Sequence, residues 1–198
     1  MSIAFISGSP SATSRSSLLL KEVQQRLASS GEETEWIAVR DLPATALLQA
    51  QAAEPNIAKA VSQVLQARAI VIASPIYKAA YSGLLKTFLD LLPQKAFEGK
   101  LVLPLSSAGS PLHVLALDFT IRPVLAALGV REVIPPVSVL DSQIQVAADG
   151  TTTFDSHILT RLDDTLELLR DRLHSQDLDA LHRRTQQNLP LSAVPLGI

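Results

Sequence analysis

Cysteine is missing from the 198 residues of this chain, and aromatic residues make up only 4% of it. Without cysteine there can be no disulfide, thiolate nucleophile, CxxC redox pair or cysteine zinc site. Charge or proline interrupts the longest apolar stretches well before the roughly 18 residues needed to cross a bilayer. Any redox chemistry must therefore come from a bound cofactor, and we expect a soluble protein.

The charge balance is nearly neutral, with a formal net charge of -2 and a hydrophobic content of 47%. These values are typical of an ordinary globular protein, and they exclude a disordered chain or one that seeks nucleic acid. The first residues, MSIAFISGSP, have no basic region before the apolar run and no small-residue cleavage site. We therefore expect a strand there rather than a signal peptide, a cytoplasmic location and no membrane partner.

Short aliphatic runs alternate with helical periodicity along most of the chain. The expected strands cover 2–7, 34–39, 69–73, 100–106 and 132–140, and the expected helices cover 16–28, 57–67, 82–92, 112–128 and 155–174. Such alternation requires parallel strands joined by right-handed crossovers, with helices on both faces of the sheet. The sequence therefore predicts an α/β protein with a doubly wound three-layer sandwich.

The length fits one domain, which we place at residues 1–175. After His174 the helical period fades and prolines appear. We therefore expect residues 176–198 to form a C-terminal extension that is extended or partly ordered and wraps a neighbouring subunit.

The loop GSPSATSRSS follows the first expected strand and leads into a helix. Unpaired N–H groups at a helix start, with the positive end of the dipole behind them, favour an anion. The residues suited to a terminal phosphate, such as that of FMN, are Ser9, Ser14, Arg15, Ser16 and Ser17. The loop lacks both GxGxxG and GxxxxGK[ST], which disfavours a Rossmann or P-loop site. The alternative is a serine that only caps the helix and an arginine that is only solvated.

The loop SPIYKAAYSG follows the third expected strand. A flat isoalloxazine ring needs apolar contacts on its faces and backbone groups along its edge. The candidates for those contacts are Pro75, Ile76, Tyr77, Lys78 and Ala79. Lys78 can favour an anionic reduced flavin or attract the phosphates of a nicotinamide donor, and the alternative is a solvated surface lysine.

Together these loops, with SPIYKAAYSGLLKTFLDLLP and GKLVLPLSSAGSPLHVLALDFTIRPVLAAL, resemble the NADPH-dependent FMN reductases of two-component alkanesulfonate monooxygenase systems. The resemblance covers nearly the whole chain. It implies a flavodoxin-like fold with a five-stranded parallel sheet of order 2-1-3-4-5. It also implies FMN as cofactor or substrate, NADPH as hydride donor, and delivery of reduced FMN to a separate oxygenase.

The resemblance carries over the phosphate and ring residues named above and adds a second ring loop. That loop consists of Ser107, Ala108, Gly109 and Ser110, where relatives often have a glycine pair. No residue is expected to act as nucleophile or general base, because hydride transfer requires only stacked rings and excluded water. We expect no metal site.

The expected helix at 112–128 is apolar on nearly every side, which predicts a homo-oligomer, a dimer or a tetramer. Pro123 inside it predicts a kink or bulge, because it leaves the carbonyl of Phe119 without a partner. The resemblance implies a π-type bulge at a tetramer interface, with Asp118 and Phe119 in its neighbourhood. Relatives commonly have tyrosine where this chain has Phe119, which cannot donate a hydroxyl hydrogen bond. The alternative is a proline-kinked core helix in which Phe119 only packs.

Two other functions use the same kind of loops. One is a non-enzymatic FMN electron carrier, which the nearly neutral net charge and the scarcity of aromatic residues disfavour. The other is a quinone or azo reductase. The sequence leaves the choice between NADPH and NADH open.

Overall fold

The computed structural model describes residues 2–113 and 115–187. Its centre is a parallel sheet made of β1 (Ile3–Ser7), β2 (Thr34–Ala38), β3 (Ala69–Tyr77), β5 (Leu101–Ala108), β6 (Glu132–Val133) and β7 (Val137–Leu140). The strands are arranged β2-β1-β3-β5, and both β6 and β7 pair with β5. The predicted doubly wound sheet of order 2-1-3-4-5, which is the flavodoxin-like order, is confirmed.

The fifth predicted strand is divided into β6 and β7. Pro135 and Pro136 lie between the two pieces, and proline has no N–H with which to continue a ladder. The register resumes where Val137 pairs with Leu105.

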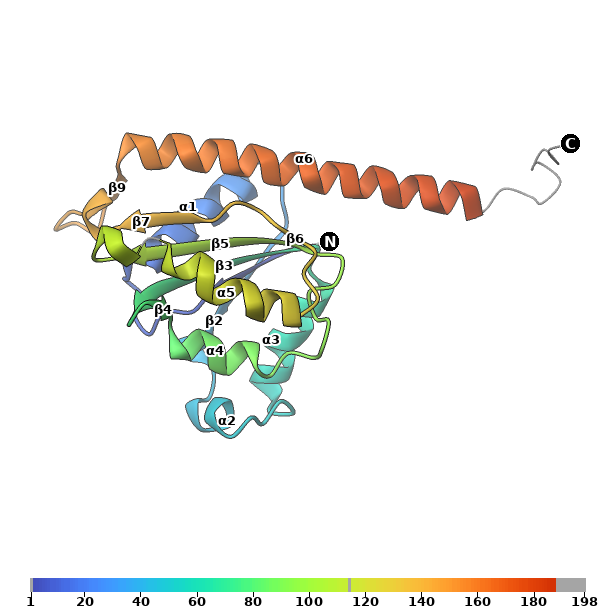
Figure 1. Cartoon of the computed structure of the whole chain (residues 1–198), viewed down its shortest axis with the longest axis horizontal. Coiled ribbons are helices and arrows are strands. Elements are labelled where there is room, and N and C mark those ends of the chain that lie inside the picture. The colour runs from blue at the N-terminus through green and yellow to red at the C-terminus, as the bar shows by residue number, and fades with distance from the viewer. Residues whose placement is uncertain (1, 114, 188–198) are drawn as a thin grey trace, which may run out of the picture.

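Helices cover both faces of the sheet (Figure 1). One buried cluster joins α1 (Arg15–Ser29) and α6 (Ser156–Gln187) to strand residues such as Phe5 and Val71. The other joins α2 (Ala44–Leu48), α3 (Pro55–Gln66), α4 (Gly83–Leu89) and α5 (Ala116–Ala127) to alternate strand residues such as Ile6 and Ile72. Because successive strand side chains point to opposite faces, the apolar runs are buried on both sides.

Two hairpins were not predicted. The short strand β4 (Ala80–Tyr81) folds back on β3, and β8 (Ile144–Val146) pairs with β9 (Thr152–Phe154). Three-residue 3-10 turns lie at Val39–Asp41, Pro111–His113 and Asp141–Gln143. These elements are too short for a periodic pattern to reveal them.

The prediction that the last helix ends at His174 is wrong, because α6 continues to Gln187. No glycine or proline occurs within that span, so nothing in the local sequence stops the helix. Asp177, beyond the expected end, accepts a hydrogen bond from Arg68 at 2.8 Å. The far part of α6 extends past the edge of the sheet in Figure 1. The prolines of the expected extension fall outside the described residues.

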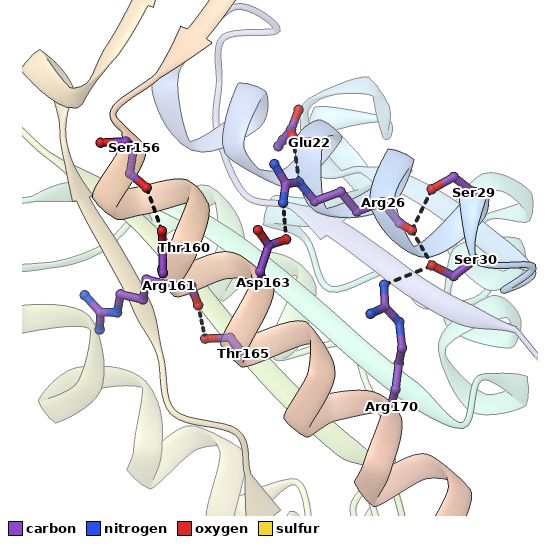
Figure 2. Close-up of polar contacts among 10 residues, drawn as sticks. All are labelled: Glu22, Arg26, Ser29, Ser30, Ser156, Thr160, Arg161, Asp163, Thr165 and Arg170. Atoms are coloured by element: carbon purple, nitrogen blue, oxygen red, sulfur yellow. Dashed lines mark hydrogen bonds and ion pairs between the residues drawn. The ribbon is translucent and has the colours of Figure 1, made fainter.

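Polar contacts join α6 to α1, as Figure 2 shows. Arg26 lies between Glu22, 2.7 Å from its Nε atom, and Asp163. Farther along α6, Arg170 donates to the Ser30 hydroxyl at 2.9 Å. These contacts are largely solvent-exposed, so the buried leucines of α6 contribute most of the stability.

The helix α5 is α-helical from Ala116 to Ala127, with Pro123 inside it. The predicted π-type bulge is therefore not found in this described segment. Both Phe119 and Pro123 are exposed, so water can bind the carbonyl that lacks its partner and the helix need not change its turn. In the ranges 2–113 and 115–187, no helix has the length and apolar character needed to cross a membrane.

Candidate functional site

The loop between β1 and α1 is a cluster of mutually bonded hydroxyls. Ser14 is the N-cap of α1, and its side chain accepts from the Ser17 backbone N–H at 3.1 Å. The Ser17 hydroxyl lies 2.9 Å from that of Ser14 and donates to the Ser11 carbonyl at 3.1 Å. The side chains of Ser9, Ser16 and Ser17 are buried, so among the four serines predicted to bind phosphate it is Ser14 that is open to a ligand.

Arg15 is held in place by the β8–β9 hairpin, which lies outside the central sheet. Its Nε atom donates to the Ile144 carbonyl of β8 at 2.9 Å. Ile144 is fully buried and anchors the β8–β9 hairpin in the core beneath α1. The guanidinium is therefore fixed at the start of α1, next to Ser14, where its charge adds to the positive end of the helix dipole.

The loop after β3 is a tight hairpin rather than an open turn. Ile76 pairs with Tyr81 and Tyr77 with Ala80, which leaves Lys78 and Ala79 as the two turn residues. Their φ angles are 51° and 60°, as a type I′ turn requires. The segment before the turn, Pro75–Tyr77, is called the shelf below. Its Pro75 is buried, and its Tyr77 is 51% exposed.

A short hydrogen-bond chain fixes the first two loops against each other. The Ser82 hydroxyl donates to the Gly8 carbonyl, and the Ser82 N–H donates to the Ser74 hydroxyl at 2.8 Å. Gly8 in turn donates its N–H to the Ala73 carbonyl at 2.8 Å. The role of Ser82 as the N-cap of α4 could be read from the sequence, but this second contact with Gly8 could not, because it joins residues 74 positions apart.

The three predicted loops meet at one cavity of about 390 Å³. Its lining residues are Ser14, Arg15, Pro75, Ile76, Tyr77, Ser107, Gly109 and Asp141. Of the predicted residues, Ser9, Ser16, Ser17 and Ala108 are buried, and Lys78, Ala79 and Ser110 are outside this lining set. The volume is within the usual range of ligand cavities, about 300 to 1,000 Å³.

Asp141 is a lining residue that the sequence did not reveal. It begins the 3-10 turn after β7, and its Oδ2 atom lies 3.7 Å from the position that a Cβ on Gly109 would occupy. Its position at the carboxyl end of the last parallel strand was the available signal, since ligands bind at that edge of such sheets.

The cavity fits the cofactor that the sequence suggests. Ser14 and Arg15 at a helix N-terminus suit a phosphate monoester, and the Pro75–Tyr77 shelf suits an aromatic ring system. Within the described part of the chain, no group of three or more histidine, aspartate or glutamate side chains could hold a metal ion.

The predicted interface residues lie apart from this cavity, on α5. Asp118 accepts from Arg122 at 2.6 Å, and Phe119 is 76% exposed. Pro123 borders a separate depression of about 400 Å³ between α4 and α5.

Comparison with known proteins gives consistent matches. Residues 1–145 match the family model described as NADPH-dependent FMN reductase. The chain is 38% identical to an "FMN reductase (NADPH)" of Escherichia coli K12 over 90% of this chain and 93% of that protein. It is also 38% identical to an "FMN reductase (NADPH)" of Pseudomonas putida KT2440, over 92% of this chain and 87% of that one. The apo structure of the NADH:FMN oxidoreductase EMOB superposes with a TM-score of 0.77 at 39% identity, covering 85% of this chain and 88% of that one.

Proposed function

The chain belongs to the family of NADPH-dependent FMN reductases, and we propose that it transfers hydride from NADPH to FMN in the cavity described above. The observation that carries the proposal is the meeting of Ser14 and Arg15 with the Pro75–Tyr77 shelf in one cavity. A phosphate group and a flat apolar ring system, joined in one ligand, satisfy both ends of it.

The residues act by binding and positioning rather than by chemistry. Bound FMN supplies the hydride acceptor. Ser14 and Arg15 hold its phosphate, and the shelf sets the plane of the ring so that a nicotinamide can stack on it. Because the loop lacks a dinucleotide fingerprint, the donor binds over the open side of the cavity and leaves after each turnover.

The proposal extends to the fate of the product. Reduced FMN is supplied to a separate flavin-dependent alkanesulfonate monooxygenase, which the resemblance of the loop motifs supports. Purified protein, NADPH, FMN and such an oxygenase, mixed with an alkanesulfonate, would release sulfite. If this mixture released no more sulfite than the same mixture without the purified protein, the extension would be overturned.

We also propose that the protein is a cytoplasmic homo-oligomer, with α5 at the interface. Phe119 on that helix is 76% exposed and Leu115, its N-cap residue, is 66% exposed, and large exposed apolar side chains that cluster mark contact surfaces. Phe119→Ser should lower the mass measured by sedimentation, and an unchanged mass would contradict this assignment.

The phosphate contact separates the proposed function from its competitors. Wild-type protein should oxidise NADPH when FMN is added, faster than with a quinone or an azo dye, and with a lower KM for FMN than for riboflavin, which has no phosphate. Arg15→Gln should reduce this preference for FMN by roughly tenfold, the size of one charge-assisted hydrogen bond. Lys21→Gln removes an equal charge from the exposed side of the same helix and serves as the control. A quinone preferred over FMN would favour the competing reductase.

A further inference from the structure

The turn that joins β3 to β4 has an unusual composition. Two consecutive residues other than glycine, Lys78 and Ala79, have left-handed φ angles of 51° and 60°. Type I′ turns favour Asn-Gly, because asparagine and glycine adopt this conformation at little cost. A lysine and an alanine adopt it less readily, so the hairpin holds a conformation that its own residues disfavour.

The geometry of the hairpin explains the φ angles, but it does not explain why position 78 is a lysine. Any pair of residues that tolerates the left-handed region would close the same two-residue loop. What Lys78 adds is an ammonium group on an exposed turn directly after Tyr77, which lines the cavity. Such strained positions are common at ligand sites, so the side chain invites a functional explanation.

The surrounding charges limit what this ammonium group can bind. Arg15, which also lines the cavity, is tied to the Ile144 carbonyl and stands at the start of α1, where we propose that the FMN phosphate binds. Asp141 is the acidic residue of the lining and would repel a second anion on its side. Lys78, directly after Tyr77, therefore adds positive charge beside the Pro75–Tyr77 shelf.

We propose that Lys78 binds a phosphate group of the reduced pyridine nucleotide as its nicotinamide stacks on the flavin. The role rests on the proposed function, because it needs a ring bound on the Pro75–Tyr77 shelf. A nicotinamide dinucleotide has its negative charge in the pyrophosphate and, in NADPH, in the 2′-phosphate. With no glycine-rich dinucleotide loop in the sequence, a side chain at the rim must supply the attraction.

The test compares Lys78→Gln with wild type using three donors: NADPH, NADH and dihydronicotinamide riboside, which has no phosphate. The kcat/KM ratio of NADPH to the riboside should fall by roughly fivefold in the variant, the upper range for an exposed ion pair. An equal fall for NADH places the contact at the pyrophosphate, and a fall for NADPH alone places it at the 2′-phosphate. An unchanged ratio, or an equal loss with all three donors, would overturn the inference.

Lys95→Gln is the matched control. Lys95 is another exposed lysine with a left-handed φ, 62°, but it precedes β5 and lies at the opposite edge of the sheet from the cavity. It should leave the ratio unchanged. Ala79→Gly relaxes the turn while keeping the charge, so it should raise thermal stability without lowering the ratio.

Calorimetric binding of NADP⁺ to the FMN-loaded protein separates this inference from the proposed function. Tighter binding to wild type than to Lys78→Gln, in a protein that fails to reduce FMN, would retain the inference and overturn the function. Equal NADP⁺ affinities of wild type and Lys78→Gln, in a protein that does reduce FMN, would overturn the inference and retain the function.

Discussion

Replacing Gly8 with alanine tests how closely the loop between β1 and α1 is packed against β3 and α4. A Cβ atom at this position would lie 2.7 Å from the Cβ of Leu85 and 3.2 Å from the Ala73 carbonyl oxygen. Leu85 is completely buried in α4, and its Cβ is fixed to the helix backbone. No rotamer change can therefore relieve the contact, and β1 must separate from α4.

The magnitude follows from two opposing effects. Overpacking of a tight interior contact costs about 1–3 kcal/mol. The stiffer unfolded chain of an alanine variant returns about 0.4–1 kcal/mol. We expect a net loss of about 1–2 kcal/mol of unfolding free energy. The affinity for FMN should fall as well, because the displaced Gly8 carbonyl is the acceptor for the Ser82 hydroxyl that joins the two loops.

Urea unfolding and FMN titration by flavin fluorescence measure the two effects. Gly83→Ala provides the control, since a Cβ there meets nothing within 4 Å and the residue begins α4. That variant should gain up to about 1 kcal/mol and bind FMN as wild type does. If Gly8→Ala proved as stable as Gly83→Ala, the close approach of β1 to α4 would be refuted.

Three further perturbations test other parts of the structure. Burial raises the pKa of the Tyr81 hydroxyl, against the lowering effect of Lys86, so the folded state favours the neutral side chain. The resulting contribution to stability is complete below pH 10 and is lost as the pH rises further. Tyr81→Phe should abolish this loss of unfolding free energy in urea and remove the higher-pH component of the tyrosinate absorbance. Leu162→Ala, in the buried face of α6, should cost about 2–5 kcal/mol, whereas Asp163→Asn should cost less than about 1 kcal/mol, and comparable losses in unfolding would contradict the view that packing holds this helix. Pro123→Ala should raise the unfolding free energy by about 1–2 kcal/mol, because a helix interior regains an N–H, and a fall would show that the proline ring makes a contact that the helix needs.

The sequence predicted the sheet well because the strands are buried on both faces. Continuous apolar runs such as AIVIA leave few alternatives to a central parallel strand, whereas the strand order came from the resemblance to a known family and not from the alternation with helices. The helix expected from residue 16 begins at Arg15, and the alternative that a serine of this loop caps it is met by Ser14. These features depend on residues near one another in the chain, and local patterns report them.

The features that the sequence missed depend on distant residues. The bond from Arg15 to Ile144 spans 129 positions, and no pattern indicates that a hairpin after the last strand returns to the first helix. The end of α6 was misplaced for a different reason. Its apolar stripe weakens after His174, but a helix already anchored by packing continues until a residue stops it.

The loops around the cavity differ in how firmly they are held. The end at which we propose that the FMN phosphate binds is held by the buried serines, by the hydrogen bond from Arg15 to the Ile144 carbonyl of β8 and by the link from Ser82 to Gly8. The turn at which we propose that the donor binds, Lys78 and Ala79, is exposed and conformationally strained. In the function that we propose, the flavin is transferred and the donor is replaced in every cycle. This division suits that function, because the rigid end sets the ring plane while the exposed end lets the nucleotide enter and leave. Substitutions near Gly8 should therefore change flavin affinity, and substitutions at Lys78 should change the use of the donor.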